Sequence, residues 1–146
     1  SRCLNGEPPI IYGDGEQMRC FTFIQDDVRP LRKLATYDNV TGEVINIGPD
    51  DEFITINTLA ETIADIIGFD LDPIYERDRP QEVRLANCSA DKAREMLDYN
   101  AQYTLRDGLQ EMVDWIEREG PKEFEYHLDL EIINEDTPNT WTDQLI

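Results

Sequence analysis

A short segment near the start of the chain carries the residue types that could bind a phosphate group. Residues 12–28 read Y-G-D-G-E-Q-M-R-C-F-T-F-I-Q-D-D-V. The dipeptide Asp14-Gly15 favours a tight turn, and Gly13 lets the backbone pass close to a ligand or another strand. Arg19 follows, and its planar guanidinium can hold a diphosphate through paired hydrogen bonds, which a lysine ammonium does less well. The segment therefore predicts a phosphate-binding site beside a folded core.

The same segment resembles a motif of the extended short-chain dehydrogenase/reductases that act on nucleotide sugars, namely the NAD-dependent epimerases, dehydratases and decarboxylases. Those enzymes carry Y-G-x-G-x-Q-x-R-x-F-x-x-V-x-D-x-V in their second half, and this chain departs from it mainly at Ile24. Four further matches follow in the family's order: G-E-V-I-N-I-G at 42–48, R-P-x-E-V at 79–83, A-D-K-A at 90–93 and L-D-Y-N-A-Q-Y-T-L-R-D-G-L at 97–109. Each motif is short, but five in the same order indicate this family.

The resemblance implies a binding site for a nucleotide sugar, with a UDP-sugar as the expected ligand and UDP-glucose 4-epimerase as the first comparison. The residues at matching positions are Tyr12, Gln17, Arg19, Asn46, Arg79 and Glu82. In the resembling enzymes the arginines of Q-x-R and R-P-x-E both bind the diphosphate, so Arg19 and Arg79 are expected to converge on one ligand. Glu82 is expected to orient Arg79 or its neighbour Arg77. The alternative for Arg19 is a surface ion pair.

Several of these positions also have a purely structural interpretation. Tyr12 would lie against the nucleotide base or ribose, but a tyrosine before a turn is as often a half-buried core residue. Gln17 would hydrogen-bond near the ligand or close the turn. Asn46 would meet the nucleotide or satisfy backbone groups at a strand end. Arg77 is a rival to Arg79 for the second diphosphate contact.

Features of the family's first half are missing from the sequence. There is no G-x-x-G-x-x-G loop to seat the NAD pyrophosphate on a helix N-terminus, and no tyrosine has a lysine four residues further on. The chain is expected to be the C-terminal half of such an enzyme, with residues 1–120 as the substrate-binding region and 121–146 as an extension. NAD is then a cofactor of the parent family, with none in this chain, which by itself should not catalyse the family's reaction.

Two other functions stay open at this point. The M-R-C-F-T of residues 18–22 is compatible with a decarboxylase of the UDP-glucuronate type, in which an arginine lies near the sugar carboxylate. Arg19 would then contact both the diphosphate and that carboxylate. The chain could instead be a binding or assembly module without chemistry. Calorimetry with UDP distinguishes nucleotide binding from assembly alone.

Composition argues against several classes of partner. The net charge is −19, from 32 acidic and 13 basic residues, whereas nucleic-acid binding needs clustered Lys and Arg. No apolar run approaches the roughly 18 residues that span a bilayer. The three cysteines, Cys3, Cys20 and Cys88, suggest neither a zinc site nor a disulfide framework, which fits a reducing cytoplasm. Because the net charge repels an anionic ligand, the arginines are expected to be concentrated at the site.

The hydrophobic pattern predicts an α/β or α+β fold of few strands with packed helices. The resemblance implies that this fold is the C-terminal half, without the family's main N-terminal Rossmann sheet. Strands are expected at 21–24, 44–47 and 73–76, with another inside 122–146. A first helix is expected from a cap at Asp26 or Asp27 to about Ala35, with Pro30 in its first turn. A second is expected from a cap at Thr55 or Asn57 to Gly68. Two more are expected, one after Ser89 and one from Thr104 to Gly120. The first two strands would border the missing sheet. The chain is therefore expected to expose apolar surface and to pair with itself or with a missing N-terminal NAD-binding half.

Overall fold

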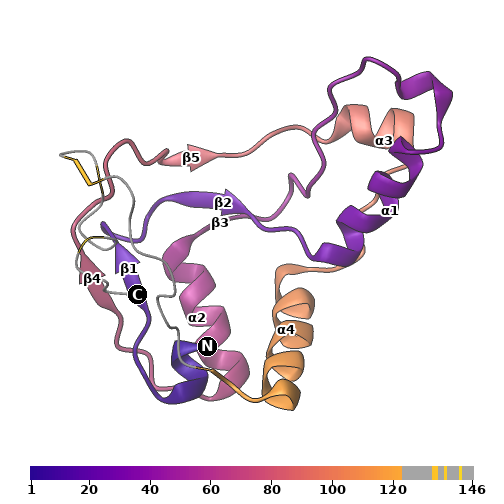
Figure 1. Cartoon of the computed structure of the whole chain (residues 1–146). Coiled ribbons are helices and arrows are strands. Elements are labelled where there is room, and N and C mark those ends of the chain that lie inside the picture. The colour runs from indigo at the N-terminus through magenta and orange to yellow at the C-terminus, as the bar shows by residue number, and fades with distance from the viewer. Residues whose placement is uncertain (123–132, 135–136, 138–141, 143–146) are drawn as a thin grey trace.

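The computed structural model describes residues 1–122, 133–134, 137 and 142. Its elements in chain order are η1 (Arg2–Asn5), β1 (Ile10–Tyr12), β2 (Met18–Cys20), α1 (Ile24–Leu34), η2 (Asp38–Val40), β3 (Phe53–Thr55), α2 (Ile56–Ile67), β4 (Ile74–Glu76), β5 (Leu85–Ala86), α3 (Asp91–Leu97) and α4 (Leu105–Glu119). Strands β1 and β4 lie beside α2 at one end, α1 and α3 lie at the other, and β2, β3 and β5 run between them (Figure 1). This mixture of short strands and helices confirms the predicted α/β class.

Two small sheets bring distant segments together. Strands β1 and β4 pair in parallel, with Tyr12 opposite Glu76. In the other sheet β2 is central, antiparallel to β3 and parallel to β5, with Arg19 opposite Ile54 on one side and Ala86 on the other. The connections β1–β2 and β4–β5 both leave the carboxyl ends of one parallel pair and enter the amino ends of another. They must therefore lie side by side.

Capping residues define α2 and α4 as the sequence predicted. The Thr55 hydroxyl accepts a hydrogen bond from the Thr58 N–H at the start of α2, and Gly68, with a φ of 67°, ends that helix in the left-handed conformation. Thr104 and Asp107 form a capping box at the start of α4. The two helices pack against each other. Their buried residues are Ala60, Ala64, Leu109 and Val113.

The prediction for the start of α1 is wrong. Residues 21–23 are not a strand, and the helix begins at Ile24 without a side-chain cap. Asp26 does not cap it, because its Oδ2 accepts hydrogen bonds from the backbone N–H groups of Gln102 and Tyr103 at 2.9 and 3.0 Å. The carboxylate thus ties α1 to the loop before α4, a role that its own sequence neighbourhood does not reveal.

Helix α1 presents an apolar stripe to the outside. Ile24, Val28 and Leu31 share one helical face and are 62%, 53% and 54% exposed. Asp26 and Pro30 are the buried residues of this helix. Pro30 lies inside the helix rather than in the predicted first turn, because the helix begins earlier than expected. Apolar surface is thus exposed, as expected, but on a helix and not on the strands that were predicted to border the missing sheet.

The segment 44–47 is not a strand, which corrects the second strand prediction. Val44 is 84% exposed and the segment has no strand assignment. A strand needs a neighbour to take its backbone hydrogen bonds, and no strand of the described residues pairs with this segment. Two of its side chains pack instead on helix α3 and the residues next to it. The contact involves Ile45, Ile47, Ala90, Ala93 and Tyr99.

Two further predicted elements are confirmed, and one predicted strand lies mostly outside the described residues. The strand expected at 73–76 is β4, Ile74–Glu76. Helix α3 follows Ser89 closely, and the Ser89 hydroxyl accepts a hydrogen bond from the Asp91 N–H at 3.1 Å, although Ala90 occupies the N-cap position. The strand expected within 122–146 falls mostly on residues outside the described part of the chain.

Candidate functional site

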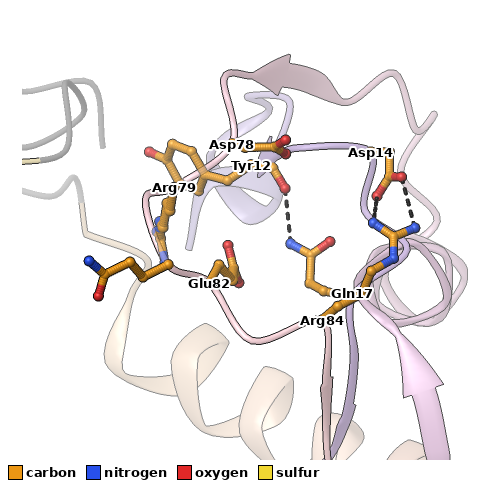
Figure 2. Close-up of a pocket in the computed structure, with 8 residues that line it drawn as sticks. Tyr12, Asp14, Gln17, Asp78, Arg79, Glu82 and Arg84 are labelled. Atoms are coloured by element: carbon orange, nitrogen blue, oxygen red, sulfur yellow. Dashed lines mark hydrogen bonds and ion pairs between the residues drawn. The ribbon is translucent and has the colours of Figure 1, made fainter.

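The β1–β2 and β4–β5 connections face each other across a pocket of about 210 Å³. Its lining residues are Tyr12, Asp14, Gln17, Asp78, Arg79, Gln81, Glu82 and Arg84. Figure 2 shows Tyr12 and Arg79 on one side of the pocket and the paired side chains of Asp14 and Arg84 on the other. Four residues predicted from the sequence, Tyr12, Gln17, Arg79 and Glu82, are thus brought together here.

Tyr12 and Gln17 are the buried members of the lining, each 8% exposed. Tyr12 is the last residue of β1, and the N–H of Gly13 after it donates to the carbonyl of Glu76 at 3.0 Å. Gln17 Nε2 donates to the Tyr12 carbonyl at 2.9 Å across the turn. Gln17 therefore closes the turn, and the peptide group between Tyr12 and Gly13 is held through both its carbonyl and its N–H.

Asn57, in the first turn of α2, fixes the tip of the same turn. Its Nδ2 donates to the Asp14 carbonyl at 3.0 Å and to Glu16 Oε1 at 2.7 Å, and its backbone N–H donates to the Gly15 carbonyl at 3.1 Å. Its Oδ1 accepts from the Tyr75 hydroxyl at 3.1 Å. The sequence pattern indicated Asn57 only as a possible helix cap. Its actual partners are far away in the sequence, so no local pattern predicts this role.

Arg79 is the guanidinium best placed to receive an anion. Its Cζ lies 4.0 Å from the centroid of the Tyr12 ring, within the range of a cation–π interaction. Within the described residues, none of the ion pairs involves Arg79. Because the ring occupies a face of the guanidinium, the N–H donors in its plane stay available for hydrogen bonds. An anion can therefore reach Arg79 without displacing a carboxylate.

Arg84 and Asp14 form the opposite side of the pocket. Arg84 Nη1 and Nη2 donate to Asp14 Oδ1 and Oδ2 at 3.3 and 3.0 Å. This hydrogen bonding from Arg84, with a further bond from the Glu16 N–H, holds the pKa of the Asp14 carboxyl below its ordinary value. The sequence did not single out Arg84, because it follows directly after the last residue of the R-P-x-E-V match. Its position as a cationic residue next to that motif is the signal that could have identified Arg84 as a lining residue.

Arg19 contacts two residues of the pocket lining, Glu82 and Arg84, but does not line the pocket itself. Arg19 Nη2 lies 3.3 Å from Glu82 Oε1, and Arg19 Nη1 donates to the Met18 carbonyl at 2.7 Å. Glu82 lines the pocket, whereas Arg19 does not. The ion pair that was the alternative interpretation of Arg19 is therefore present, whereas Glu82 was expected to orient Arg79 or Arg77 and contacts Arg19 instead. The convergence of Arg19 and Arg79 on one diphosphate stays a prediction.

Asn46 and Arg77 lie outside the lining. Asn46 is exposed, and its neighbours Ile45 and Ile47 pack near α3, away from the turn that holds Tyr12. Arg77 belongs to the same connection as Arg79, but only Arg79 lines the pocket. The structure therefore does not bring Asn46 to the other predicted residues.

Carboxylates offset the arginines of this pocket. The lining contains Arg79 and Arg84 together with Asp14, Asp78 and Glu82. The expected concentration of arginines is present, but without a net positive charge. Because Arg84 is paired with Asp14, Arg79 is the lining arginine that can bind an anion without a change of partner.

Comparison with known proteins identifies the family. A model of the GDP-mannose 4,6 dehydratase family matches residues 1–112. The chain belongs to the nucleotide-sugar epimerase/dehydratase family of extended short-chain dehydrogenase/reductases. The resemblance read from the five motifs is thereby confirmed.

Individual family members match the same region. UDP-N-acetyl-alpha-D-glucosaminuronate decarboxylase of Bacillus cytotoxicus is 30% identical in an alignment of 119 positions that covers 77% of this chain and 36% of that protein. UDP-glucose 4-epimerase of Thermotoga maritima, solved with UDP-glucose, is 32% identical with a TM-score of 0.73, over 81% of this chain and 37% of that one. UDP-glucuronic acid 4-epimerase of Bacillus cereus, solved with UDP-glucuronic acid and NAD, is 31% identical with a TM-score of 0.75, over 80% and 37%. The chain thus spans little more than a third of these relatives.

The described residues do not contain the kind of loop that binds the NAD pyrophosphate at the edge of a nucleotide-binding sheet. Pyrophosphate binding of that kind uses a glycine-rich loop leading from a strand into a helix. Here the Gly13–Gly15 turn leads into strand β2, and the segments that enter α1, α2, α3 and α4 contain no glycine. The chemistry proposed below therefore involves the chain's own residues alone. The described part also contains no cluster of metal-ligating side chains and no helix long and apolar enough to cross a membrane.

Proposed function

We propose that the pocket between the β1–β2 and β4–β5 connections binds the diphosphate of a nucleotide sugar, with a UDP-sugar as the first candidate. Arg79 carries this proposal, because it lines the pocket, stacks on Tyr12 at 4.0 Å and has no carboxylate partner among the described residues. The solved relatives that contain UDP-glucose and UDP-glucuronic acid support a uridine nucleotide.

The energy gained at Arg79 must exceed the repulsion from the nearby carboxylates. Hydrogen bonds from a charged donor contribute about 1.5–3 kcal/mol each, and a guanidinium makes two at once to a phosphate. Repulsion between two unit charges about 4 Å apart is about 1 kcal/mol in bulk water and about 4 kcal/mol near a protein surface, and salt screens it when the charges are exposed. Asp78 and Glu82 are exposed, so the proposal requires that these carboxylates stay in contact with water when a diphosphate contacts Arg79. Movement of Arg19 from Glu82 to the ligand would add a second clamp.

We further propose that residues 1–120 are the substrate-binding part of an NAD-dependent epimerase or dehydratase like UDP-glucose 4-epimerase, and that 121–146 are an extension. The relatives are much longer than this chain, and their remaining length is the proposed source of the NAD site and the catalytic tyrosine and lysine. The α1 stripe would then face that NAD-binding part, in a cytoplasmic enzyme. Binding energy from the nucleotide would hold the sugar in position for chemistry elsewhere.

Isothermal calorimetry with UDP and UDP-glucose tests the binding role. The wild-type chain should bind UDP with a Kd on the order of micromolar, and Arg79→Ala should weaken it about 10- to 100-fold. Arg106→Ala is the matched control, because Arg106 pairs with Asp65 at 2.7 Å, a contact between α4 and α2 that lies outside the pocket lining. The absence of binding heat for the wild-type chain would contradict the proposal, and so would equal losses in both variants.

A decarboxylase is the second candidate, favoured by the match to the Bacillus cytotoxicus enzyme and by the position of Arg19 beside the pocket. Its substrate would carry a carboxylate that UDP-glucose lacks. In this case UDP-glucuronic acid should bind more tightly than UDP-glucose, and Arg19→Ala should remove the preference. An assembly module without nucleotide chemistry predicts no binding of either compound.

A further inference from the structure

We propose that Tyr12 is a positioning residue. The face of its aromatic ring holds the Arg79 guanidinium in a position to bind a diphosphate. The inference rests on the proposed function of the pocket and adds the device that prepares its arginine. It differs from the role implied by the family resemblance, in which the tyrosine lies against the nucleotide.

The ring of Tyr12 is held by its own strand, whereas the backbone that carries Arg79 is exposed. Tyr12 ends a paired strand, is 8% exposed and has its carbonyl bound by Gln17 Nε2. Arg79 belongs to an exposed connection between β4 and β5. Its side chain therefore adapts to the ring, and not the reverse. Figure 2 shows the guanidinium of Arg79 directly beside the Tyr12 ring.

The way in which Arg79 is held decides what it can bind. Arg84 and Arg19 are held by Asp14 and Glu82, which occupy N–H donors that a phosphate would need. An aromatic ring attracts a guanidinium through its face and leaves the in-plane donors unused. Restricting the side chain beforehand also lowers the entropy that is lost when a ligand binds. Tyr12 thus prepares Arg79 without competing with the anion.

The Tyr12 hydroxyl contributes nothing to this arrangement. The atom is buried and has no hydrogen-bond partner within the part of the chain that the structure describes. If the ring face is the active feature, phenylalanine should replace tyrosine without loss. If the hydroxyl contacts the base or ribose, Tyr12→Phe should weaken binding. The conservative variant therefore separates the two roles.

The first experiment is calorimetry with UDP on Tyr12→Phe and Tyr12→Leu. We expect Tyr12→Phe to keep the wild-type affinity within about twofold and Tyr12→Leu to bind on the order of three- to thirtyfold more weakly. The loss from Tyr12→Leu should disappear in an Arg79→Ala background and persist in an Arg84→Ala background. A merely structural role for Tyr12 would weaken binding equally in both backgrounds, which overturns the proposal.

The second experiment needs no ligand and remains informative if a variant is destabilised. The proton signals of the Arg79 side chain should show an upfield ring-current shift in the wild type and in Tyr12→Phe, and should lose it in Tyr12→Leu. Thermal denaturation verifies that each variant is folded. A wild type that binds no UDP would contradict the proposed function itself. Binding that is unchanged in Tyr12→Leu, or weakened in Tyr12→Phe, would contradict only the positioning role of Tyr12.

Discussion

At the scale of single residues, the pocket depends on how closely the β1–β2 turn approaches α2. Gly15 has a φ of +71°, and a Cβ at this position would lie 1.9 Å from Asn57 Oδ1. Asn57 cannot move away cheaply, because it also binds the Asp14 carbonyl, Glu16 and Tyr75. The glycine is required both by its conformation and by its neighbour.

Gly15→Ala should therefore destabilise the protein by about 2–4 kcal/mol, from left-handed strain and from displaced hydrogen bonds. Gly6→Ala is the matched control, because Gly6 has a φ of +78° and a Cβ added there would meet nothing within 4 Å. It should cost only the conformational part, about 1–2 kcal/mol. Urea denaturation measures both. Equal destabilisation would show that Asn57 adjusts freely and does not fix the turn.

At the scale of elements, α3 is joined to the segment before β3 by a charged contact. Asp50 Oδ2 accepts from the Ala90 N–H at 2.9 Å and from Arg94 Nη1 at 3.0 Å, and Arg94 Nη2 pairs with Asp50 Oδ1. The bond from Arg94, followed by that from Ala90, lowers the pKa of Asp50 from 3.8 to about 2. Because segment 44–47 has no strand neighbour among the described residues, this contact helps to hold it on α3.

The lowered pKa gives a pH dependence with a defined sign. Asp50 binds its proton more weakly in the folded than in the unfolded chain, so its contribution to stability is complete above the ordinary pKa of 3.8 and is lost as pH falls toward about 2. Thermal melting followed across this range should show a steeper loss for the wild type than for Asp50→Asn. Asp70→Asn, at an exposed loop position after α2, is the control and should keep the wild-type slope. Identical slopes for all three proteins would refute the role of Asp50.

At the scale of the whole molecule, an apolar stripe coexists with a large negative charge. Ile24, Val28 and Leu31 are all more than half exposed on α1, while the chain carries a net charge of −19. Burial of the stripe against another surface is favourable, but like charge opposes the approach of two copies at low ionic strength. Salt screens this repulsion over a distance of about 10 Å at 0.1 M.

Self-association of the chain should therefore increase with salt. Sedimentation should show a smaller species at about 0.01 M salt and a larger one at about 1 M, where the screening length falls to about 3 Å. Val28→Glu should reduce association at high salt, because it places a charge in the stripe. Glu61→Gln, an exposed change on α2, should not reduce it. A monomer at every salt concentration would show that the stripe does not drive association.

Features set by near neighbours in the chain were predictable from the sequence. The cap at Thr55, the capping box of Thr104 and Asp107 and the left-handed Gly68 depend on contacts over a few residues, and all three are present. The order of five motifs likewise identified the family without coordinates. Fold class and four of the pocket's lining residues followed from these patterns.

Only the tertiary structure decided which distant groups meet. Parallel pairing of β1 with β4 brings the Arg79 loop over Tyr12, and the start of α2 places Asn57 on the β1–β2 turn. The loop before α4 binds the carboxylate of Asp26, which the local pattern had given, along with Asp27, as a possible helix cap. A side chain hydrogen-bonds to whichever donor the fold brings within about 3 Å, and sequence periodicity holds no record of that distance. The sequence determined which groups are available for binding, and the parallel pairing of β1 with β4 and of β2 with β5 determined which of them can act together.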